Sequence, residues 1–465
     1  MSDLTRLTIA EAAALIRERK LSPVELTDAC LARIESVEPK INAFITITSD
    51  EARAAAKTAA DEIARGEYRG PLHGIPVALK DLFATAGVRT TAGSTILADN
   101  IPNTDSDPAA RLKAAGAVLL GKLNLHEFAY GATGVNPHFG SCRNPWDTSR
   151  ITGGSSSGSG ASVASGECFA ALGTDTGGSI RIPASLCGIV GLKPTFGRVS
   201  RRGVIPLSWS LDHVGPLARS VEDAAVVLQA IAGHDPQDAS SSAEPVSGYA
   251  AGLRDGVKGL RIGVPGEFFF DNLGPEVEAA VRKAIGVLEA LGASVREVSL
   301  PLITEAPAAV TAIMLPEALA YHRKWMEERP DDYGDDVRYR LELGATFLAV
   351  HYVQAQRLRE MIVARWRDEV FSQVDLLVMP TTMAPAFPIE RSDLSVTFSL
   401  IRNTNPLNLL GVPAISVPCG FTETGLPIGL QLAGRWWDEP TALRAAYAYE
   451  QAILPGKEHK LAPPL

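Results

Sequence analysis

One lysine and two serines of this chain stand where their side chains could carry out nucleophilic catalysis. Lys80 ends a short apolar run, Ser155 lies in the Gly/Ser-rich tract 151–162, and Ser179 follows two glycines. A serine hydroxyl becomes a nucleophile when a neighbouring base removes its proton. A lysine can be that base only when it is neutral, and burial favours the neutral form. Each feature alone also has an ordinary explanation, which is an exposed lysine, a flexible linker or a glycine turn.

Two other motifs match known patterns only in part. Residues 116–122 fit the G-x-x-x-x-G-K pattern of a phosphate-binding loop, but Leu123 stands where Mg²⁺ binding needs a serine or threonine. Residues 154–158 fit the G-x-S-x-G pattern of a nucleophile elbow. The preceding segment 144–150 is typical of a turn, whereas an elbow needs a strong strand before it. Neither pattern is favoured.

The placement of cysteines and histidines argues against thiol or metal chemistry. Cys187 lies in an apolar run, where a free cysteine behaves as a small hydrophobic residue, so a catalytic pairing with His213 is disfavoured. His126 and Glu127 begin an H-E-x-x-H pattern, but Tyr130 replaces the second histidine. The cysteines number five and form no C-x-x-C pair, which predicts reduced thiols and neither a disulfide framework nor a metal site.

The elements that must position these residues can be placed from sequence patterns. Capping boxes at residues 8–11 and 22–25 predict helices within the segment 1–66. The apolar run 74–80 fits a buried strand that delivers Lys80 at its carboxyl end. The Gly/Ser tract is followed at once by apolar sequence, so it is expected to be an ordered backbone loop rather than a linker.

The second half of the chain alternates between strands and helices. Residues 233–258 predict a long surface loop, and 302–372 are expected to be mostly helical and charged. Further helices are expected at 49–65, 220–232, 275–291 and 437–453, and further strands at 117–120, 260–265, 295–300, 374–379, 414–418 and 428–432. Because strands occur on both sides of every candidate boundary, we expect one large α/β domain with helices on both faces of its sheet.

The composition gives no bulk electrostatic reason to bind nucleic acid or an anionic membrane. Among 465 residues, Asp and Glu number 53 against 44 Lys and Arg, which leaves a net charge of −9. The amino terminus is charged throughout, so no signal peptide is expected. The longest uncharged run, 403–422, contains three prolines and does not fit a membrane helix. The prediction is a cytoplasmic protein.

Two sequence blocks around the serines match a known family when they are taken together. The segment 173–183 reads Gly-Thr-Asp-Thr-Gly-Gly-Ser-Ile-Arg-Ile-Pro, and Ser179 follows Ser155 by 24 residues. With Lys80 upstream, these blocks resemble the amidase signature family of serine hydrolases. One departure is Ser157, which stands where the family usually has glycine. Serine is small, so a helix start at this position should survive.

The resemblance covers nearly the whole chain and is densest over 71–217. It implies a single amidase domain, 1–465, in which a central mixed β-sheet is covered by helices on both faces. Within that domain, the amino-terminal helices would span 1–66, the signature core 71–217, and a helical segment that could cover the pocket 302–372.

The resemblance also implies a mechanism without metal or cofactor. Ser179 would be the nucleophile, and Ser155, held in a cis peptide, would connect it to the base Lys80. A bridging serine can accept one proton while it donates another. The backbone N–H groups expected to form the oxyanion hole belong to Thr176, Gly177, Gly178 and Ser179.

Other residues would support the site or bind the substrate. Asp175 and Arg181 are expected to fix loops rather than react, and Ser156 to form a hydrogen bond within the relay. The acyl pocket is expected at Ala129, Tyr130 and Gly131, although Tyr130 could equally be a core residue. Within 302–372, the side chains that could form a hydrophobic lid, or only the undersides of helices, are Met314, Tyr321, Trp325 and Met326.

Several functions remain open at this point. The favoured one is a stand-alone amidase that hydrolyses a small carboxamide or anilide, or a related ester or carbamate, through an acyl-enzyme. A glutaminase subunit of a tRNA-dependent amidotransferase would need an acidic residue where Ile401 stands. A carboxybiuret- or allophanate-type hydrolase is a further alternative. A non-catalytic binding protein would be expected to lose one of the three catalytic residues. The expected partner is a small-molecule amide, without nucleic acid or membrane, and a homodimer is left open.

Overall fold

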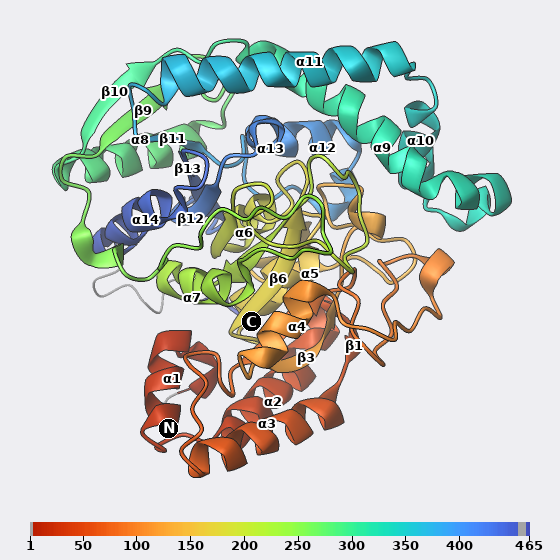
Figure 1. Ribbon diagram of the computed structural model, residues 1–465, viewed down its shortest axis with the longest axis vertical. Coiled ribbons are helices and arrows are strands. Elements are labelled where there is room, and N and C mark those ends of the chain that lie inside the picture. Colours follow the sequence, from red (N-terminus) through yellow and green to blue (C-terminus); the bar gives the residue numbers. More distant parts are fainter. Residues whose placement is uncertain (1–2, 454–461) are drawn as a thin grey trace.

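A mixed β-sheet of eleven strands runs through the molecule (Figure 1), in a computed structural model that describes residues 3–453 and 462–465. The strand order is β1-β3-β2-β6-β8-β7-β12-β13-β11-β9-β10. Pairing is parallel within β3-β2-β6 and within β11-β9-β10, and antiparallel elsewhere in this sheet. The strands are β1 (Phe44–Ile47), β2 (Pro76–Lys80), β3 (Val118–Leu123), β6 (Ala170–Asp175), β7 (Val190–Lys193), β8 (His213–Ala218), β9 (Arg261–Pro265), β10 (Ser294–Val298), β11 (Leu376–Pro380), β12 (Ala414–Phe421) and β13 (Pro427–Gly434).

Helices cover the sheet and extend beyond it. The helices are α1 (Ile9–Arg17), α2 (Pro23–Ile41), α3 (Ser49–Ala64), α4 (Asp107–Ala114), α5 (Ser157–Ser165), α6 (Arg181–Cys187), α7 (Val221–Ile231), α8 (Pro275–Ala290), α9 (Ala306–Glu328), α10 (Asp335–Gly344), α11 (Ala349–Arg365), α12 (Leu394–Ile401), α13 (Asn405–Leu410) and α14 (Glu439–Ile453). One group, α7, α14 and α8, packs in a row against strands of the sheet, and α5 and α6 form a second group against the strands. The predicted α/β fold, a large mixed sheet flanked by helices, is confirmed.

The central strands have no polar-apolar alternation because both of their faces are covered. Every residue of β2, β6, β7 and β8 is buried. Strands buried on both faces are typically continuous apolar runs. Such a run, which the sequence shows before Lys80, therefore ends with a lysine in the interior of the protein.

The amino-terminal helices begin at the two predicted capping boxes. In α1 the Thr8 side chain accepts from the Glu11 N–H while the Glu11 carboxylate accepts from the Thr8 N–H. At the start of α2 the Ser22 hydroxyl accepts from the Val24 N–H, and the Glu25 carboxylate accepts from the Ser22 N–H. These helices and α3 lie together at one end of the molecule, below the sheet in Figure 1.

The Gly/Ser tract differs from the ordered loop that its composition predicted, but its helix begins at Ser157, where the resemblance implied a helix start. Its second half is not a loop but the helix α5, which begins at Ser157 and is buried along its whole length. Glycine and serine are weak helix formers, so tertiary packing stabilises this helix. The small residues permit very close contacts: a Cβ at Gly158 would lie 2.2 Å from the Ala43 carbonyl oxygen. Upstream, the expected turn 144–150 is part of a hairpin of β4 (Arg143–Asn144) and β5 (Asp147–Ile151).

The helices α9, α10 and α11 form a layer at the opposite end from α1–α3 (Figure 1). Helix α9 packs against α10, α11 and α13. Among the described residues, the helical stretch Ile303–Glu328 alone is long and apolar enough to cross a membrane by length and composition, with a mean hydropathy of 1.2. These inter-helix contacts account for part of its apolar composition.

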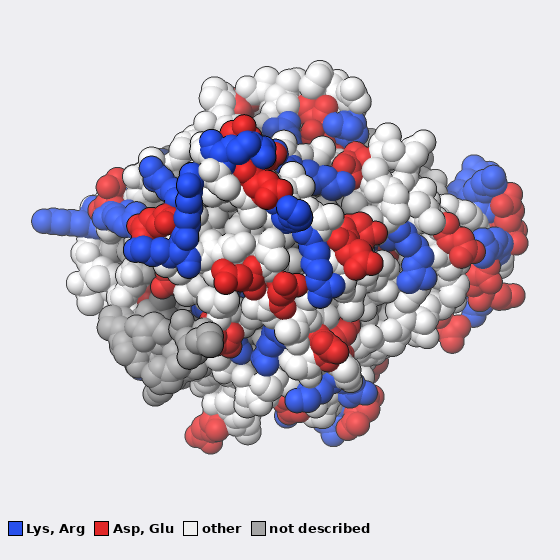
Figure 2. Space-filling model, turned by 90° about the horizontal axis from the view of Figure 1, so that it is seen from below, with Lys and Arg blue, Asp and Glu red and all other residues white. Residues whose placement is uncertain are grey.

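Charged side chains are mixed on the face that Figure 2 shows. Lysines and arginines alternate there with aspartates and glutamates, and neither sign forms a broad patch. A protein that binds nucleic acid nonspecifically would need a continuous basic surface. This face offers none.

The sheet topology brings the first site residues together. Strands β2 and β6 are parallel neighbours, so their carboxyl ends lie at the same edge of the sheet. Lys80 ends β2 and Asp175 ends β6. The loop that follows β6 leads through Ser179 into α6.

Candidate active site

Lys80 is fully buried and hydrogen-bonded to two hydroxyl groups. Its Nζ lies 2.7 Å from Ser155 Oγ and 2.8 Å from Thr174 Oγ1, and its exposed fraction is 0%. Burial lowers the pKa of Lys80 to about 7, although the carboxylates of Asp212 and Asp175 act in the opposite direction. A substantial fraction of this lysine is therefore neutral near pH 7, as a base must be.

The first serine block surrounds Ser155. The peptide bond between Gly154 and Ser155 is cis, in agreement with the geometry that the resemblance implied. The Ser156 hydroxyl donates to the Thr174 carbonyl at 3.2 Å, so it holds the segment to β6 rather than joining the Lys80–Ser155 pair directly. The Ser157 hydroxyl donates to the Asn124 carbonyl at 3.3 Å. The departure from glycine at this position is therefore accommodated without loss of the helix start.

The second serine block lies beside the first. The Ser156 N–H donates to the Ser179 carbonyl at 3.3 Å, which joins the two segments through their backbones. Ser179 is 8% exposed and lines a cavity of about 180 Å³. A buried hydroxyl at the wall of a cavity is well placed to meet a bound carbonyl group.

The loop 176–179 presents some of its N–H groups to the cavity but not all. Among the described residues, no hydrogen-bond acceptor is found for the N–H groups of Thr176, Gly177 and Ser179, and these three residues line the cavity. Gly178 differs from the expectation, because its N–H donates to Asp175 Oδ1 at 2.9 Å and it does not line the cavity. The expectation that the Gly178 N–H is an oxyanion donor is therefore corrected: this N–H anchors the loop to Asp175 instead.

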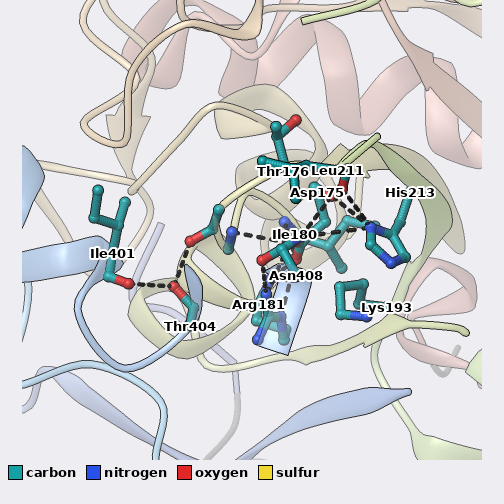
Figure 3. A network of polar contacts seen from close by, with 12 residues as sticks. Asp175, Thr176, Ile180, Arg181, Lys193, Leu211, His213, Ile401, Thr404 and Asn408 are labelled. Atoms are coloured by element: carbon teal, nitrogen blue, oxygen red, sulfur yellow. Dashed lines mark hydrogen bonds and ion pairs between the residues drawn. The ribbon is translucent and has the colours of Figure 1, made fainter. Parts of the chain in front are cut away.

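Asp175 and Arg181 form the buried ion pair beneath this loop (Figure 3). Arg181 donates to both carboxylate oxygens, from Nη2 at 2.8 Å and from Nε at 3.0 Å. Burial alone would raise the pKa of Asp175, but the Arg181 guanidinium more than compensates and holds it below its usual range. Asn408 and Gln431 accept from two further guanidinium protons, on Nη2 and Nη1, at 2.7 Å each.

Replacing Arg181 with glutamine is expected to lower the free energy of unfolding by about 3–5 kcal/mol, because Asp175 would remain as a buried and unpaired charge. Urea denaturation followed by circular dichroism measures this loss. The matched control is Arg323→Gln, which removes an arginine from an exposed pair with Glu327 and should cause little change. A loss no larger than that of the control would contradict the role of the pair.

The cavity is mainly apolar and is built from segments distant in sequence. The three predicted pocket residues Ala129, Tyr130 and Gly131 all line it together with Ser179. The other lining side chains come largely from α9, α10 and α12, and include Val310, Met314, Leu315, Leu343, Phe398 and Ile401. Of the four lid candidates, Met314 alone lines this cavity; Trp325 packs on Phe128, and Tyr321 on Trp209.

Arg340 is the charged side chain of the cavity wall, and no sequence pattern pointed to it. Its guanidinium lies 5.0 Å from the centre of the Tyr130 ring. Asp336 accepts hydrogen bonds from Nη2 and, through its carbonyl, from Nε, while His126 lies 2.8 Å from the same carboxylate. Among the described residues, no hydrogen-bond acceptor is found for Arg340 Nη1. Arg340 carries no local signal, since only the packing of α10 against α9 brings it to the cavity.

The weaker motifs have structural roles. Residues Val118–Leu123 of the phosphate-loop pattern form the strand β3, and Lys122 donates to the Phe83 carbonyl at 2.6 Å. Burial raises the pKa of the Cys187 thiol and lowers that of His213 well below its usual value. All five cysteines are free, and the described residues contain no group of three or more side chains placed to hold a metal ion.

Comparisons with known proteins agree over almost the whole chain. A family model described as Amidase matches residues 25–443. An amidase of Pseudomonas putida is 48% identical over 471 residues, covering 99% of this chain and 98% of that protein. One subunit of the glutamyl-tRNA(Gln) amidotransferase of Roseiflexus sp. (strain RS-1) is 47% identical over 476 residues, covering 97% of each. A solved chain from a vestigial protein complex, described as revealing the evolutionary origins of an s-triazine catabolic enzyme, is 40% identical with a TM-score of 0.92, covering 96% of this chain and 99% of that one.

Proposed function

The chain belongs to the amidase signature family of amidohydrolases, and from that premise we propose that it is a stand-alone amidase for small carboxamides and anilides with a largely apolar acyl group. The observation that carries the proposal is the buried Lys80–Ser155 hydrogen bond of 2.7 Å beside a cavity that Ser179 lines. The lysine pKa of about 7 supports its use as a base near neutral pH.

In the proposed mechanism, the Ser179 hydroxyl attacks the amide carbonyl carbon. Its proton passes to Ser155, whose own proton passes to neutral Lys80, so that a C–O bond forms and the lysine becomes charged. The carbonyl oxygen gains negative charge and is stabilised by the free N–H groups of the loop 176–179. The C–N bond then breaks as the proton returns through Ser155 to the leaving nitrogen. Water repeats these steps on the acyl-enzyme and releases the acid.

The cavity wall supports an apolar substrate with one hydrogen-bond acceptor. Its side chains are mostly aliphatic or aromatic, and the Arg340 guanidinium can donate to a carbonyl, a nitro group or a carboxylate. The helices α9 and α10 contribute part of this wall, so the proposal includes a pocket-covering role for the segment 302–372 within one amidase domain.

The glutaminase alternative has support in the amidotransferase relative from Roseiflexus. Glutamine carries an ammonium group, which needs an anionic partner when it is bound in an apolar pocket. Ile401 lines the cavity, and no Asp or Glu is among the cavity-lining residues that the structure describes. The proposal therefore predicts a lower kcat/KM for glutamine than for neutral amides. It also predicts that the protein acts on a small molecule in the cytoplasm, without nucleic acid and without an obligatory partner chain.

A substrate panel with the purified chain tests this proposal. The panel contains benzamide, hexanamide, p-nitroacetanilide, phenyl carbamate, biuret and L-glutamine, and product formation is followed by chromatography. We expect kcat/KM for at least one neutral amide or anilide to exceed that for glutamine by about 100-fold, the order that one unpaired buried charge costs. Ile401→Asp should lower the ratio of kcat/KM for the neutral amide to kcat/KM for glutamine. Ile401→Asn introduces a side chain of the same size as aspartate but without its charge, so it should lower this ratio less. Preferred turnover of glutamine or biuret by the unmodified chain would overturn the proposal.

A further inference from the structure

Thr404 contacts the loop that carries Ser179, although it is distant in sequence and has no part in the proton relay (Figure 3). The Thr404 hydroxyl lies 2.5 Å from the Gly177 carbonyl oxygen and 3.1 Å from the Ile401 carbonyl oxygen. A hydroxyl has one proton to donate. The shorter distance assigns that proton to Gly177. Thr404 is fully buried, so water does not compete for this contact.

The peptide unit between Gly177 and Gly178 is thereby held from both sides. Its carbonyl accepts from Thr404, and its N–H donates to Asp175 Oδ1 at 2.9 Å. Asn408 fixes the same carboxylate by donating to Asp175 Oδ1 at 2.8 Å and to the Asp175 carbonyl at 2.9 Å. A peptide plane bound at both of its polar ends cannot rotate without breaking two buried hydrogen bonds.

This fixed plane controls the direction of the neighbouring N–H groups. The N–H of Gly177 and the N–H of Ser179 belong to the peptide units on either side of it. Both groups have no acceptor among the described residues, and both residues line the cavity. Holding the middle unit limits the rotation of its neighbours and keeps their N–H groups directed toward a bound oxyanion.

The close approach of Thr404 explains why a glycine stands at 178. Gly178 has a φ of +131°, and a Cβ there would lie 2.1 Å from Thr404 Oγ1 and 2.7 Å from Ile182 Cδ1. Any other residue would displace the threonine hydroxyl from the loop. The glycine and the threonine are therefore two parts of one contact.

From this geometry we infer that Thr404 is a positioning residue for the oxyanion hole. It acts through the Gly177–Gly178 peptide unit, and among the described residues its hydroxyl forms hydrogen bonds only with the carbonyls of Gly177 and Ile401, not with the nucleophile or the lysine base. The inference rests on the proposed function, since it assumes that Ser179 attacks a carbonyl or a similar electrophile in this cavity.

The test uses an alkyl fluorophosphonate probe, which reacts at a catalytic serine and places negative charge on its phosphoryl oxygen. The variants are Thr404→Val, which replaces the hydroxyl with a methyl group of similar size, and Thr404→Ser, which keeps the hydroxyl. The control is Thr382→Val, because Thr382 is also a buried threonine that donates to a carbonyl, that of Ala384 at 3.0 Å, away from the loop. The maximal inactivation rate and the half-saturating probe concentration are measured separately for each variant.

Thr404→Val is expected to lower the maximal inactivation rate by about 10–100-fold, somewhat less than the loss of a whole oxyanion donor. The half-saturating concentration should change by no more than about 2-fold, since ground-state binding does not use the oxyanion hole. Thr404→Ser should retain most of the rate, and Thr382→Val all of it. The melting temperatures of all variants are recorded, so that a folding defect is recognised.

Two results would overturn the inference. One is an unchanged inactivation rate in Thr404→Val, and the other is an equal loss in Thr404→Ser and Thr404→Val. If Ser179 were not the nucleophile, the result would be different, because the unmodified chain would then react no faster with the probe than Ser179→Ala does. A wrong substrate class would instead show in the amide panel and would leave the probe comparison unchanged. When the unmodified chain reacts faster than Ser179→Ala, an unchanged inactivation rate in Thr404→Val contradicts only the positioning role of Thr404.

Discussion

Ser179→Ala is expected to lower amide turnover by about 10⁴–10⁶-fold, the loss seen when a serine hydrolase has no nucleophile. The fold should persist, because among the described residues the Ser179 hydroxyl donates no hydrogen bond that a neighbour depends on. Turnover of the best amide in the panel measures the first effect, and thermal unfolding measures the second. A variant that melts normally and hydrolyses nothing is the expected result.

A neighbouring serine provides the matched control. Ser156 is also buried and lies in the G-x-S-x-G pattern, but its hydroxyl donates to the Thr174 carbonyl. Ser156→Ala should therefore retain measurable turnover and lose some stability. If Ser156→Ala were inactive and Ser179→Ala active, the nucleophile would belong to the elbow pattern instead.

Probe labelling identifies the nucleophile independently of turnover. Mass spectrometry should find the fluorophosphonate adduct on Ser179. Trypsin cannot separate the candidates, because no lysine or arginine lies between Arg150 and Arg181 and one peptide carries both serine blocks. The adduct must be localised by fragmenting this peptide, and an adduct on the block 155–157 would contradict the assignment to Ser179.

The parts of the fold that local sequence determines were predicted well. Capping boxes placed the first two helices, and the apolar run before Lys80 indicated a strand buried on both faces. A single-sequence pattern could not predict α5, since its glycines and serines disfavour a helix and only the surrounding strands and α6 stabilise it.

The candidate site was predictable where the two serine blocks and the upstream lysine together resemble the family, although the roles of these residues stay predictions. The blocks around Lys80 and the two serines marked side chains that the structure brings to one edge of the sheet. The oxyanion loop was less predictable, because the choice among its N–H groups depends on which of them Asp175 occupies. Arg340 and Thr404 could not be found, because each is placed by tertiary packing: Arg340 by the contact of α10 with α9, and Thr404 by its contact with Gly177, which lies 227 residues away in the sequence.

Lys80→Met is expected to remove most amide hydrolysis and to affect esters much less. Methionine keeps an unbranched side chain in the buried space and removes the amine. A base and acid in a relay contributes about 10²–10⁴-fold. The matched substrates are p-nitroacetanilide and p-nitrophenyl acetate, which share an acetyl group and differ in the leaving atom. Nitrogen must be protonated as the C–N bond breaks, whereas p-nitrophenoxide leaves without a proton.

The pH dependence of the unmodified enzyme should identify the same group. Lys80 acts as a base only when neutral, and its pKa is lowered to about 7 by burial. Below that value most of the lysine is protonated, so kcat/KM should fall about tenfold for each pH unit on the acid side and level off above about pH 8. In Lys80→Met this inflection should disappear from the residual ester hydrolysis. An inflection that survives the substitution would mean that another group titrates, and equal losses for the amide and the ester would mean that Lys80 does not protonate the leaving nitrogen. The two measurements together separate the base function of the lysine, which both substrates need, from its acid function, which the amide alone needs.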